Sequence, residues 1–179
     1  MRPEEPRVRP AREADLPAIL EIYNEIIATS TAVYSSTPST LDERSKWFAA
    51  RTKAGFPVLV AEVNEGVAGF ASFGEFRGAW PGYRYSVEHS VHVRADQRGQ
   101  GIGTELTSAL FPLASALGMH VMLGGIDAAN QASLRMHTRL GFELVGHFRE
   151  VGHKFGRWLD LVFVQRFLDA PGAHRPASQ

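Results

Sequence analysis

The chain has 179 residues, 44% of them hydrophobic, and its 19 basic and 19 acidic side chains give a formal net charge of zero. This length fits one domain of ordinary size, and a neutral chain is not expected to have nucleic acid as its main partner. The lack of cysteine excludes disulfides and cysteine nucleophiles and fits a reducing, cytoplasmic compartment. No stretch approaches the ~18 apolar residues of a membrane span, so no membrane partner is expected.

The two ends of the chain differ in composition from the rest. Residues 1–6 are charged and rich in proline, and residues 170–179 form a polar tail, so we expect both to be disordered. Neither an internal repeat nor a low-complexity linker divides the part between them. We therefore expect residues 7–169 to form one domain.

After a short first strand, the sequence predicts two helices. Asp15 is a plausible N-cap for the first, and Pro17 falls in its first turn. Apolar residues form one stripe along this helix: Leu16, Ile19, Leu20, Tyr23, Ile26 and Ile27. The second helix is expected over residues 41–53, with Trp47 and Phe48 directed inward.

Two apolar runs around Asn64-Glu65-Gly66 then predict a β-hairpin. A valine-rich strand ending near Arg94 follows, and residues 101–117 have leucines at helical spacing. Last come a short buried strand ("HVMLGGI"), a helix ("NQASLRMHTRL") and two closing strands ("FELVGHFREVG" and "RWLDLVFVQRFL"). This order predicts an α/β (α+β) fold with antiparallel pairs early in the chain and parallel crossovers later.

The loop Arg98-Gly99-Gln100-Gly101-Ile102-Gly103 stands between the valine-rich strand and the helix after it. Glycines permit positive φ angles and bring backbone N–H groups close to a ligand, and a helix N-terminus attracts anions. Arginine adds a forked positive charge. The loop therefore predicts a site for a pyrophosphate.

Two other glycine motifs are alternatives for this loop. A dinucleotide fingerprint would need glycine at position 104, where threonine stands, although Asp127 does end the next strand. A P-loop would need Gly-Lys-Ser/Thr after the glycines, which the chain lacks. The remaining alternative is a turn that only precedes a core helix.

The loop and the last predicted helix resemble the signatures of a known family. Arg98-x-x-Gly101-x-Gly103 resembles the acetyl-CoA motif of the GCN5-related N-acetyltransferases (GNAT), and "NQASLRMHTRLGF" resembles that family's second signature. Further stretches are similar, in register, to the phosphinothricin and methionine sulfoximine N-acetyltransferases of this family: "IYNEII", "FPVLVAE", "GFASFGEFR", "YSVEHSVHV", "NQASLRMH" and "GHKFGRWLDLVFVQ". The resemblance covers nearly the whole expected domain.

This resemblance implies the GNAT fold, in which a central mixed, largely antiparallel sheet has splayed central strands and is flanked by helices. It implies acetyl-CoA as the cosubstrate, held where the strands splay, and a homodimer. The implied contacts are the backbone of the valine-rich strand, the N–H groups of the glycine loop and an asparagine beyond the next strand: Val91, His92, Val93, Arg98, Gly99, Gln100, Gly101, Ile102, Gly103, Thr104 and Asn130.

Glu88 is the candidate general base. In an extended strand Glu88, Ser90 and His92 share one face, opposite the valines, so the acid points into a cleft if the valines fill the core. Related acetyltransferases carry a glutamate here as base or substrate contact, and a general base contributes roughly 10²- to 10⁴-fold to such a reaction. The alternative is a glutamate paired with an arginine on a solvated face.

His137 is the second catalytic candidate. It stands where many family members have the tyrosine that protonates the departing thiolate, and an ordinary histidine pKa of about 6.5 would suit that task. The alternative is a helix histidine with local hydrogen bonds only. His89 and His92 lie three apart on a strand and face opposite ways, so we expect no metal.

Aromatic and basic residues gather in "FGEFRGAWPGYRYS", between the hairpin and the strand of Glu88. Aromatic walls and a forked cation suit a small molecule with a carboxylate, although Trp80-Pro81-Gly82 could be only a turn. Lys154, near Arg157 and Trp158, is expected as a second wall of the site or as a subunit contact. The predicted acceptor contacts are Phe76, Arg77, Trp80, Tyr85, Glu88 and Lys154.

These residues favour an acetyl-CoA-dependent N-acetyltransferase that acts on a small amino-acid-like amine of the phosphinothricin, methionine sulfoximine or methionine sulfone type. Glu88 would deprotonate the ammonium, and backbone donors of the strand would stabilise the oxyanion. One alternative keeps the fold and changes the acceptor to a protein N-terminus or a polyamine. Another is an acyl-CoA-binding module without catalysis.

Overall fold

The computed structural model describes residues 6–168, so the two predicted tails, residues 1–6 and 170–179, lie outside the described residues except for Pro6. Its strands are β1 (Arg7–Pro10), β2 (Val58–Val63), β3 (Gly66–Glu75), β4 (Ser86–Val93), β5 (Val121–Asp127), β6 (Glu143–Lys154) and β7 (Arg157–Phe167). Its α-helices are α1 (Leu16–Thr29), α2 (Leu41–Lys53), α3 (Ile102–Ala116) and α4 (Gln131–Arg139). Short 3-10 turns lie at Glu13–Asp15, Pro81–Tyr83 and Ala95–Gln97.

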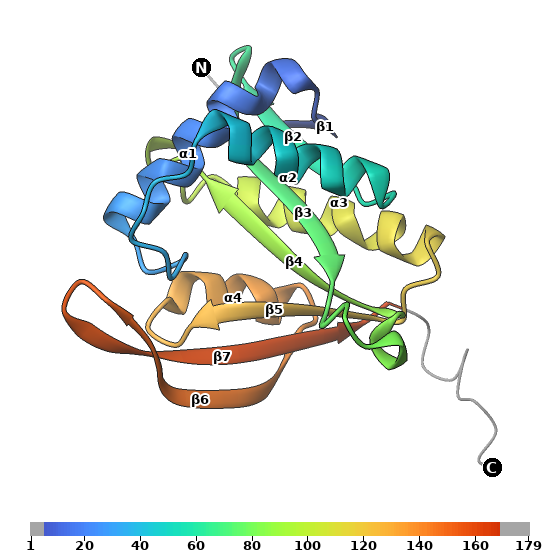
Figure 1. The fold of residues 1–179 in the computed structure, drawn as a ribbon, viewed down its shortest axis with the longest axis vertical. Helices are drawn as coiled ribbons and strands as arrows, with labels where there is room; N and C mark the ends of the chain where they lie inside the picture. Colours follow the sequence, from blue (N-terminus) through green and yellow to red (C-terminus); the bar gives the residue numbers. More distant parts are fainter. Residues whose placement is uncertain (1–5, 169–179) are drawn as a thin grey trace.

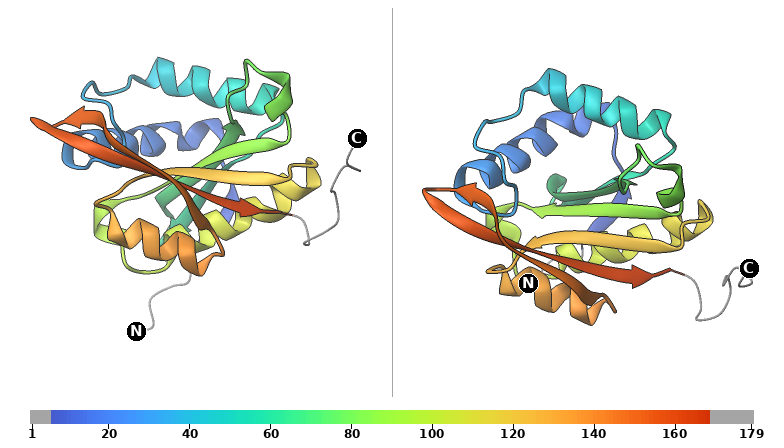
Figure 2. Two further views of the ribbon diagram at one scale, coloured as in Figure 1. Left: turned by 90° about the horizontal axis from the view of Figure 1, so that it is seen from below. Right: turned by 60° about the horizontal axis from the view of Figure 1, so that its bottom comes forward.

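All the strands join one seven-stranded sheet in the order β1-β2-β3-β4-β5-β7-β6. Helices α1 and α2 cover one face of this sheet, and α3 and α4 cover the other (Figures 1 and 2). Each face has its own apolar cluster, one with α1 and one with α3, because both faces of the central strands are covered by helices. The predicted mixed sheet flanked by helices is confirmed.

The strand directions correct one detail of the prediction. Within residues 6–168, β4 and β5 form the single parallel pair, while β5 pairs antiparallel with β7 and β7 antiparallel with β6. The last two strands therefore form a hairpin and not a further parallel crossover. Its two-residue turn, Phe155-Gly156, has both φ angles positive, at 51° and 73°.

The predicted hairpin between β2 and β3 is confirmed. Its loop residues Asn64 and Glu65 have φ angles of 49° and 62°, as expected for the mirror-image turns that match the twist of paired strands. Helix α2 also begins as its sequence indicates, because the Thr40 hydroxyl accepts from the Glu43 N–H at 3.2 Å while the Glu43 carboxylate accepts from the Thr40 N–H at 2.8 Å.

The predicted cap of α1 needs a correction. Asp15 precedes α1, but its side chain makes no capping bond to that helix. Its carboxylate instead accepts from the Arg12 N–H at 2.7 Å and from the Arg9 guanidinium at 2.7 and 2.8 Å. The nearby cation of β1 thus takes the carboxylate, and Asp15 ties the first strand to the start of α1.

No helix within residues 6–168 is long and apolar enough to cross a membrane. Helices α1, α3 and α4 contain buried residues, whereas α2 contains none.

Candidate functional site

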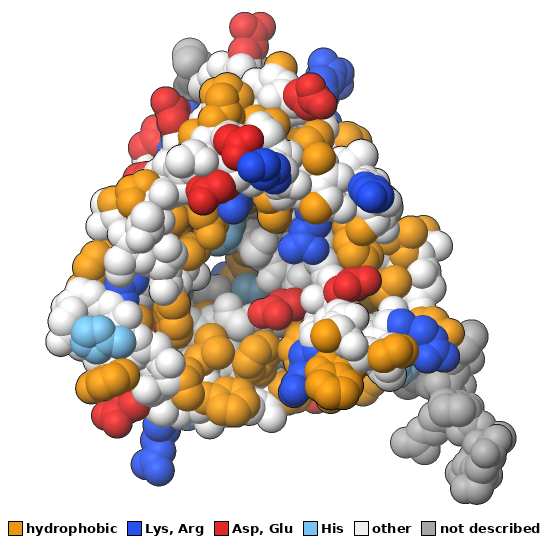
Figure 3. Space-filling view, viewed as in Figure 1, with side chains coloured by type: hydrophobic (Ala, Val, Ile, Leu, Met, Phe, Trp, Pro, Cys, Tyr) orange, Lys and Arg blue, Asp and Glu red, His pale blue; other side chains and the backbone are white. Residues whose placement is uncertain are grey.

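A cleft of about 390 Å³ opens where β4 and β5 separate, and we call it the central cleft. Figure 3 shows this face hollowed near its middle, with histidine and acidic side chains in and beside the hollow. The lining comes from α1, α2 and the segment between them, from β3, β4 and β5, and from α4 with its N-cap: Tyr23, Ala32, Val33, Arg44, Trp47, Phe70, Glu88, His89, Ser90, Val91, His92, Gly124, Gly125, Ile126, Asp127, Asn130, Ser133 and His137.

The cleft exists because the two parallel strands pair over a short length only. Their register runs from Ser86–Val121 to Glu88–Leu123, and no pairing of the described chain joins them beyond that point. Past Glu88, β4 remains paired on its other side with β3. One backbone edge of β4 therefore faces the cleft, which agrees with the expectation of splayed central strands.

Two glycines of β5 make room for the side chains of β4. A Cβ at Gly124 would stand 2.9 Å from His89 Nε2, and one at Gly125 would stand 3.3 Å from Glu88 Oε1. The pair "GG" in the predicted strand thus keeps β5 free of side chains at the positions where the carboxylate and imidazole of β4 cross the gap.

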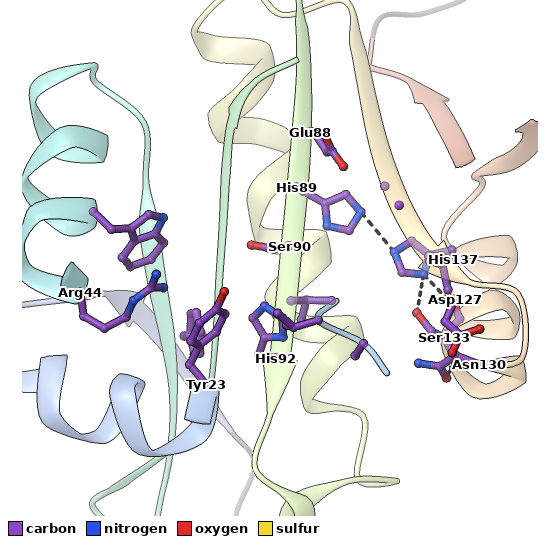
Figure 4. A pocket seen from close by; sticks show the side chains of 18 residues that line it. Tyr23, Arg44, Glu88, His89, Ser90, His92, Asp127, Asn130, Ser133 and His137 are labelled. Carbon is purple, nitrogen blue, oxygen red and sulfur yellow. Dashed lines mark hydrogen bonds between the residues drawn. The ribbon is translucent and has the colours of Figure 1, made fainter. Parts of the chain in front are cut away.

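Glu88 lies at the point of separation and is half-buried, facing the cleft (Figure 4). Its carboxylate makes no hydrogen bond or ion pair with any residue in the described range. Burial raises the pKa of Glu88, and the charge of Arg51 opposes this shift. A half-buried carboxylate with a raised pKa and unoccupied oxygens can accept a proton from a ligand near neutral pH.

His137 lies across the cleft from β4, on α4, and it is buried. Its Nδ1 is 2.7 Å from the Ser133 carbonyl oxygen, and its Nε2 is 3.1 Å from His89 Nε2 (Figure 4). Burial lowers the pKa of His137, although the Ser133 carbonyl opposes this. The pKa of His137 is therefore below the ordinary value on which its predicted role relied, because β4 and Phe142 enclose the imidazole.

The opposite wall of the cleft is formed by α1 and α2. The guanidinium carbon of Arg44 lies 4.2 Å from the ring centroid of Tyr23 and 5.0 Å from that of Trp47. The His92 ring packs at 5.7 Å from Tyr23 and at 5.0 Å from Phe70. This wall is aromatic and carries one cation.

The glycine loop has the conformation that its sequence predicts. Gly99 and Gly101 have φ angles of 77° and 86°, and a Cβ at either would meet no atom within 4 Å, so open space lies beside the loop. Gly101 precedes α3, whose first backbone N–H groups have no carbonyl in the helix to bind. Arg98 folds back, with its Nε donating to the Val93 carbonyl at 3.1 Å. These residues fit a pyrophosphate cradle.

Gly103 has a different task in the same loop. A Cβ there would lie 3.1 Å from Met136 Sδ and 3.7 Å from Val93 Cγ2. Its missing side chain lets α3 approach α4 closely. The Asn130 amide oxygen accepts from the Ser133 N–H at 3.1 Å and caps α4, so its NH₂ group is the part that can meet a ligand in the cleft.

The structure brings some of the predicted residues together and leaves others apart. Glu88, Val91, His92, Asn130 and His137 line the central cleft. The glycine loop lies at the N-terminus of α3, outside the lining, and Val93 ends β4 beside it.

The predicted acceptor contacts of the aromatic loop are not among the lining residues. Phe76 and Arg77 follow β3 next to Glu88, since Gly74 pairs with Glu88 in the sheet. The Phe76 ring packs on Tyr83 and Phe163. Trp80 and Tyr85 are 61% and 52% exposed, so both lie on the surface, beyond the end of the cleft where Glu88 stands.

Lys154 stands behind the wall of the cleft. Its side chain is buried, and its Nζ donates to the carbonyl oxygens of Ser30 and Val33 at 2.6 and 2.7 Å. Tyr34 belongs to the same segment between α1 and α2, and its Oη donates to the Asp160 carbonyl at 3.0 Å. Lys154 thus holds the segment that walls the cleft and is not among the residues that line it.

The sequence interpretation missed the contribution of α2. Arg44 lies three residues before Trp47, which was expected to point inward, so helical spacing already placed the arginine on the same face. Asp127 lines the cleft and accepts a hydrogen bond from the Thr31 hydroxyl, whereas its place in the sequence indicates only part of a dinucleotide motif. Among residues 6–168 there is no group of three or more His, Cys, Asp or Glu side chains that could hold a metal, and the expectation of no metal stays a prediction.

Comparison with known proteins agrees with this geometry. Residues 8–163 match the family model described as an acetyltransferase (GNAT) domain. A relative from Pseudomonas paraeruginosa, named L-methionine sulfoximine/L-methionine sulfone acetyltransferase, is 50% identical over 90% of this chain and 94% of its own.

Two solved structures are also similar. A GNAT superfamily phosphinothricin acetyltransferase from Sinorhizobium meliloti in complex with AcCoA has a TM-score of 0.92 and 38% identity, over 97% of this chain and 94% of its own. A ribosomal-protein-alanine N-acetyltransferase from Brucella melitensis has a TM-score of 0.88 and 45% identity, over 90% of this chain and 99% of its own. The chain therefore belongs to the GNAT family and is an N-acetyltransferase.

Proposed function

We propose that this enzyme transfers the acetyl group of acetyl-CoA to the α-amine of a small amino acid whose side chain resembles methionine sulfone, methionine sulfoximine or phosphinothricin. The half-buried carboxylate of Glu88, at the separation of β4 and β5, carries this proposal. The name of the Pseudomonas relative supports the acceptor class, and the structure with AcCoA supports the cosubstrate.

In the proposed reaction Glu88 takes a proton from the acceptor ammonium, directly or through a water molecule. The free amine then attacks the thioester carbonyl carbon, the C–S bond breaks, and CoA leaves as a thiolate. Backbone N–H groups on the cleft edge of β4 are the proposed donors to the oxyanion. The raised pKa of Glu88 supports its role, because a base whose pKa is closer to neutral is a better match for this proton transfer.

For the cosubstrate we propose that the N–H groups from Arg98 to Thr104 hold the pyrophosphate. The positive φ angles of Gly99 and Gly101 and the open space beside them support this assignment. The backbone of β4 from Val91 to Val93 and the amide of Asn130 would hold the pantetheine arm. The thiolate then leaves near His137, which stays a candidate proton donor together with water.

Phe76, Arg77, Trp80 and Tyr85 are proposed to act at the Glu88 end of the cleft. Arg77 has a φ of 52°, a left-handed conformation that is rare for a residue with a side chain, and its guanidinium lies 5.4 Å from the Tyr83 ring. An arginine held in this way on the loop between β3 and β4 suits the α-carboxylate of an amino acid.

A protein N-terminus is the second candidate acceptor, since one similar structure is titled a ribosomal-protein-alanine N-acetyltransferase. The cleft volume of about 390 Å³ and its aromatic lining by Tyr23 and Trp47 favour a small molecule over a peptide. Release of free thiol from acetyl-CoA tests both. Turnover is expected with methionine sulfone, methionine sulfoximine or phosphinothricin and not with a peptide that begins with alanine; the reverse result would replace the proposal.

A homodimer is also proposed. Strand β6 ends the sheet, and apolar side chains of the β6–β7 hairpin are between 48% and 64% exposed: Leu144, Val145, Phe148, Val151, Phe155, Trp158 and Phe167. Such a group of exposed apolar side chains is typical of a protein–protein contact. Sedimentation analysis should give twice the mass of the chain, and Phe148→Glu should shift the protein to monomer. A monomeric wild-type protein would contradict this.

A further inference from the structure

Arg44 presents a cation to the central cleft that no carboxylate of the described residues neutralises. Its side chain lies against the rings of Tyr23 and Trp47, at 4.2 and 5.0 Å from the guanidinium carbon, which restricts its orientation. Its Nε is buried and has no hydrogen-bond partner within residues 6–168. A buried polar group without a partner is costly, and an oxygen atom of a ligand in the cleft would complete its bonding.

Arg44 forms no ion pair within residues 6–168. Its neighbour Glu43 is exposed and accepts from Ser39 and Thr40, and the two carboxylates that line the cleft, Glu88 and Asp127, make no hydrogen bond to it. His92 faces Arg44 from β4, and burial, followed by the charges of Arg44 and Arg98, lowers the pKa of His92 to about 4, so the imidazole stays neutral near pH 7. The other neighbours on this wall are Tyr23 and Trp47. Figure 4 shows Arg44 and Tyr23 on the helix side and His92 opposite them on β4.

Arg44, on α2, lies opposite His92 of β4, and this level along the cleft indicates which part of an acceptor Arg44 can reach. Glu88 and His92 share a face of β4 four residues apart, which is about 13 Å at roughly 3.3 Å per residue. The α-carboxylate of an amino acid is attached to the same carbon as the reacting amine and so stays near Glu88. The group that reaches Arg44 belongs to the far end of the acceptor's side chain.

We propose that Arg44 determines specificity by binding the oxygen atoms of an oxidised sulfur or phosphorus centre at the end of the acceptor's side chain. This inference rests on the proposed function. A sulfone or a phosphinate carries two oxygens on one tetrahedral centre, which the forked N–H groups of a guanidinium can meet together. A thioether offers one weak acceptor and leaves the guanidinium without a partner.

The test compares two acceptors that differ only at this centre, L-methionine sulfone and L-methionine, by kcat/KM with the wild-type enzyme and with Arg44→Met. The variant should lose about 10- to 100-fold on the sulfone, the size of one charge-assisted hydrogen bond, and change little on methionine. Arg44→Lys should recover part of the loss. Lys46→Met is the matched control, because Lys46 is on the same helix, 75% exposed and paired with Asp42.

The outcomes separate this inference from the proposed function. Equal losses of Arg44→Met on both acceptors, or no loss on either, would overturn the inference while the proposed function stands. A folded wild-type enzyme that acetylates neither acceptor would overturn the proposed function and this inference with it. L-methionine sulfone amide, which lacks the α-carboxylate, should show the same loss; if the loss disappears with the amide, Arg44 binds the α-carboxylate and the inference fails.

Discussion

His89 and His137 form a buried imidazole pair, with their Nε2 atoms 3.1 Å apart and their ring centroids 5.1 Å apart. Nδ1 of His137 faces the Ser133 carbonyl, so it must carry the proton. Nε2 of a neutral His137 then accepts, and Nε2 of His89 is the donor. The pair links β4 to α4 across the cleft. This proton arrangement gives each of its two bonds a donor and an acceptor and leaves Nδ1 of His89 buried without a partner among the described residues.

This pair and His92 predict that the protein loses stability in mild acid. Burial, helped by nearby positive charge, lowers the pKa of His89 to about 3 and that of His92 to about 4. Their unfolded pKa is about 6.5, so the unfolded state binds more protons below that pH and stability falls as the pH falls through this range. Each of these two histidines should lower the free energy of unfolding by about 2 kcal/mol at pH 5.

Denaturant unfolding at pH 7 and pH 5 measures this loss. The variant His92→Phe keeps an aromatic ring against Phe70 and Tyr23 and removes the titrating group. Its stability should fall less between the two pH values than that of the wild-type protein. An equal decrease in both proteins would contradict the assignment of this acid sensitivity to His92.

The lowered pKa of His137 makes a separate prediction about catalysis. Because burial lowers the pKa of His137 below its ordinary value, kcat should not decline between pH 6.5 and 8 through the loss of an imidazolium. The pH profiles of kcat for the wild-type enzyme and for His137→Gln should then have the same shape over that range. A declining limb that is present in the wild-type enzyme and absent in the variant would show that protonated His137 acts on the thiolate.

Glu88→Gln should separate catalysis from folding. Removing a general base is expected to lower kcat/KM by roughly 10²- to 10⁴-fold. Because burial raises the pKa of Glu88, its ionised form disfavours folding as the pH rises through that pKa, and a neutral amide of similar size should not lower the thermal midpoint at pH 7. Calorimetry should show unchanged CoA binding. Full activity in a folded variant that binds CoA would show that another group is the base.

Gly74→Ala should shift the acid side of the rate profile. A Cβ at Gly74 would lie 1.2 Å from Arg51 Nη1, the mobile end of a long side chain, so the guanidinium must move away. The charge of Arg51 lowers the pKa of Glu88 against the effect of burial, and its displacement should raise that pKa further. The acid limb of kcat/KM should then move to higher pH. Gly66→Ala, where the nearest atom is 3.6 Å away, is the control and should leave the limb in place.

The sequence predicted most of the fold because local signals and the family resemblance agreed with the packing. The loop at Asn64-Glu65, the helix after Gly101 and the helix that follows Asn130 form as expected. The acceptor side was harder to predict, because the position of Arg44 against Tyr23 depends on how α1 and α2 pack together. Sequence proximity to Glu88 favoured the loop of Arg77, whereas the tertiary fold brings a different aromatic and cationic wall to the cleft.

Gly101→Ala should weaken CoA binding. Gly55→Ala is the matched control, which measures the effect of backbone strain alone. Gly101 has a φ of 86° and Gly55, after α2, has a φ of 75°, and a Cβ at either would meet nothing within 4 Å. Alanine at each should therefore cost about 1 kcal/mol of stability or slightly more, from the left-handed conformation.

Only Gly101 lies in the proposed pyrophosphate cradle, where the added methyl group occupies the space of the ligand and the strained loop moves its N–H groups. By titration calorimetry with CoA, Gly101→Ala should bind at least about 10-fold more weakly, which corresponds to losing one charge-assisted hydrogen bond, while Gly55→Ala should bind as the wild-type protein does. Equal affinities in the two variants would mean that the loop before α3 does not hold the phosphates.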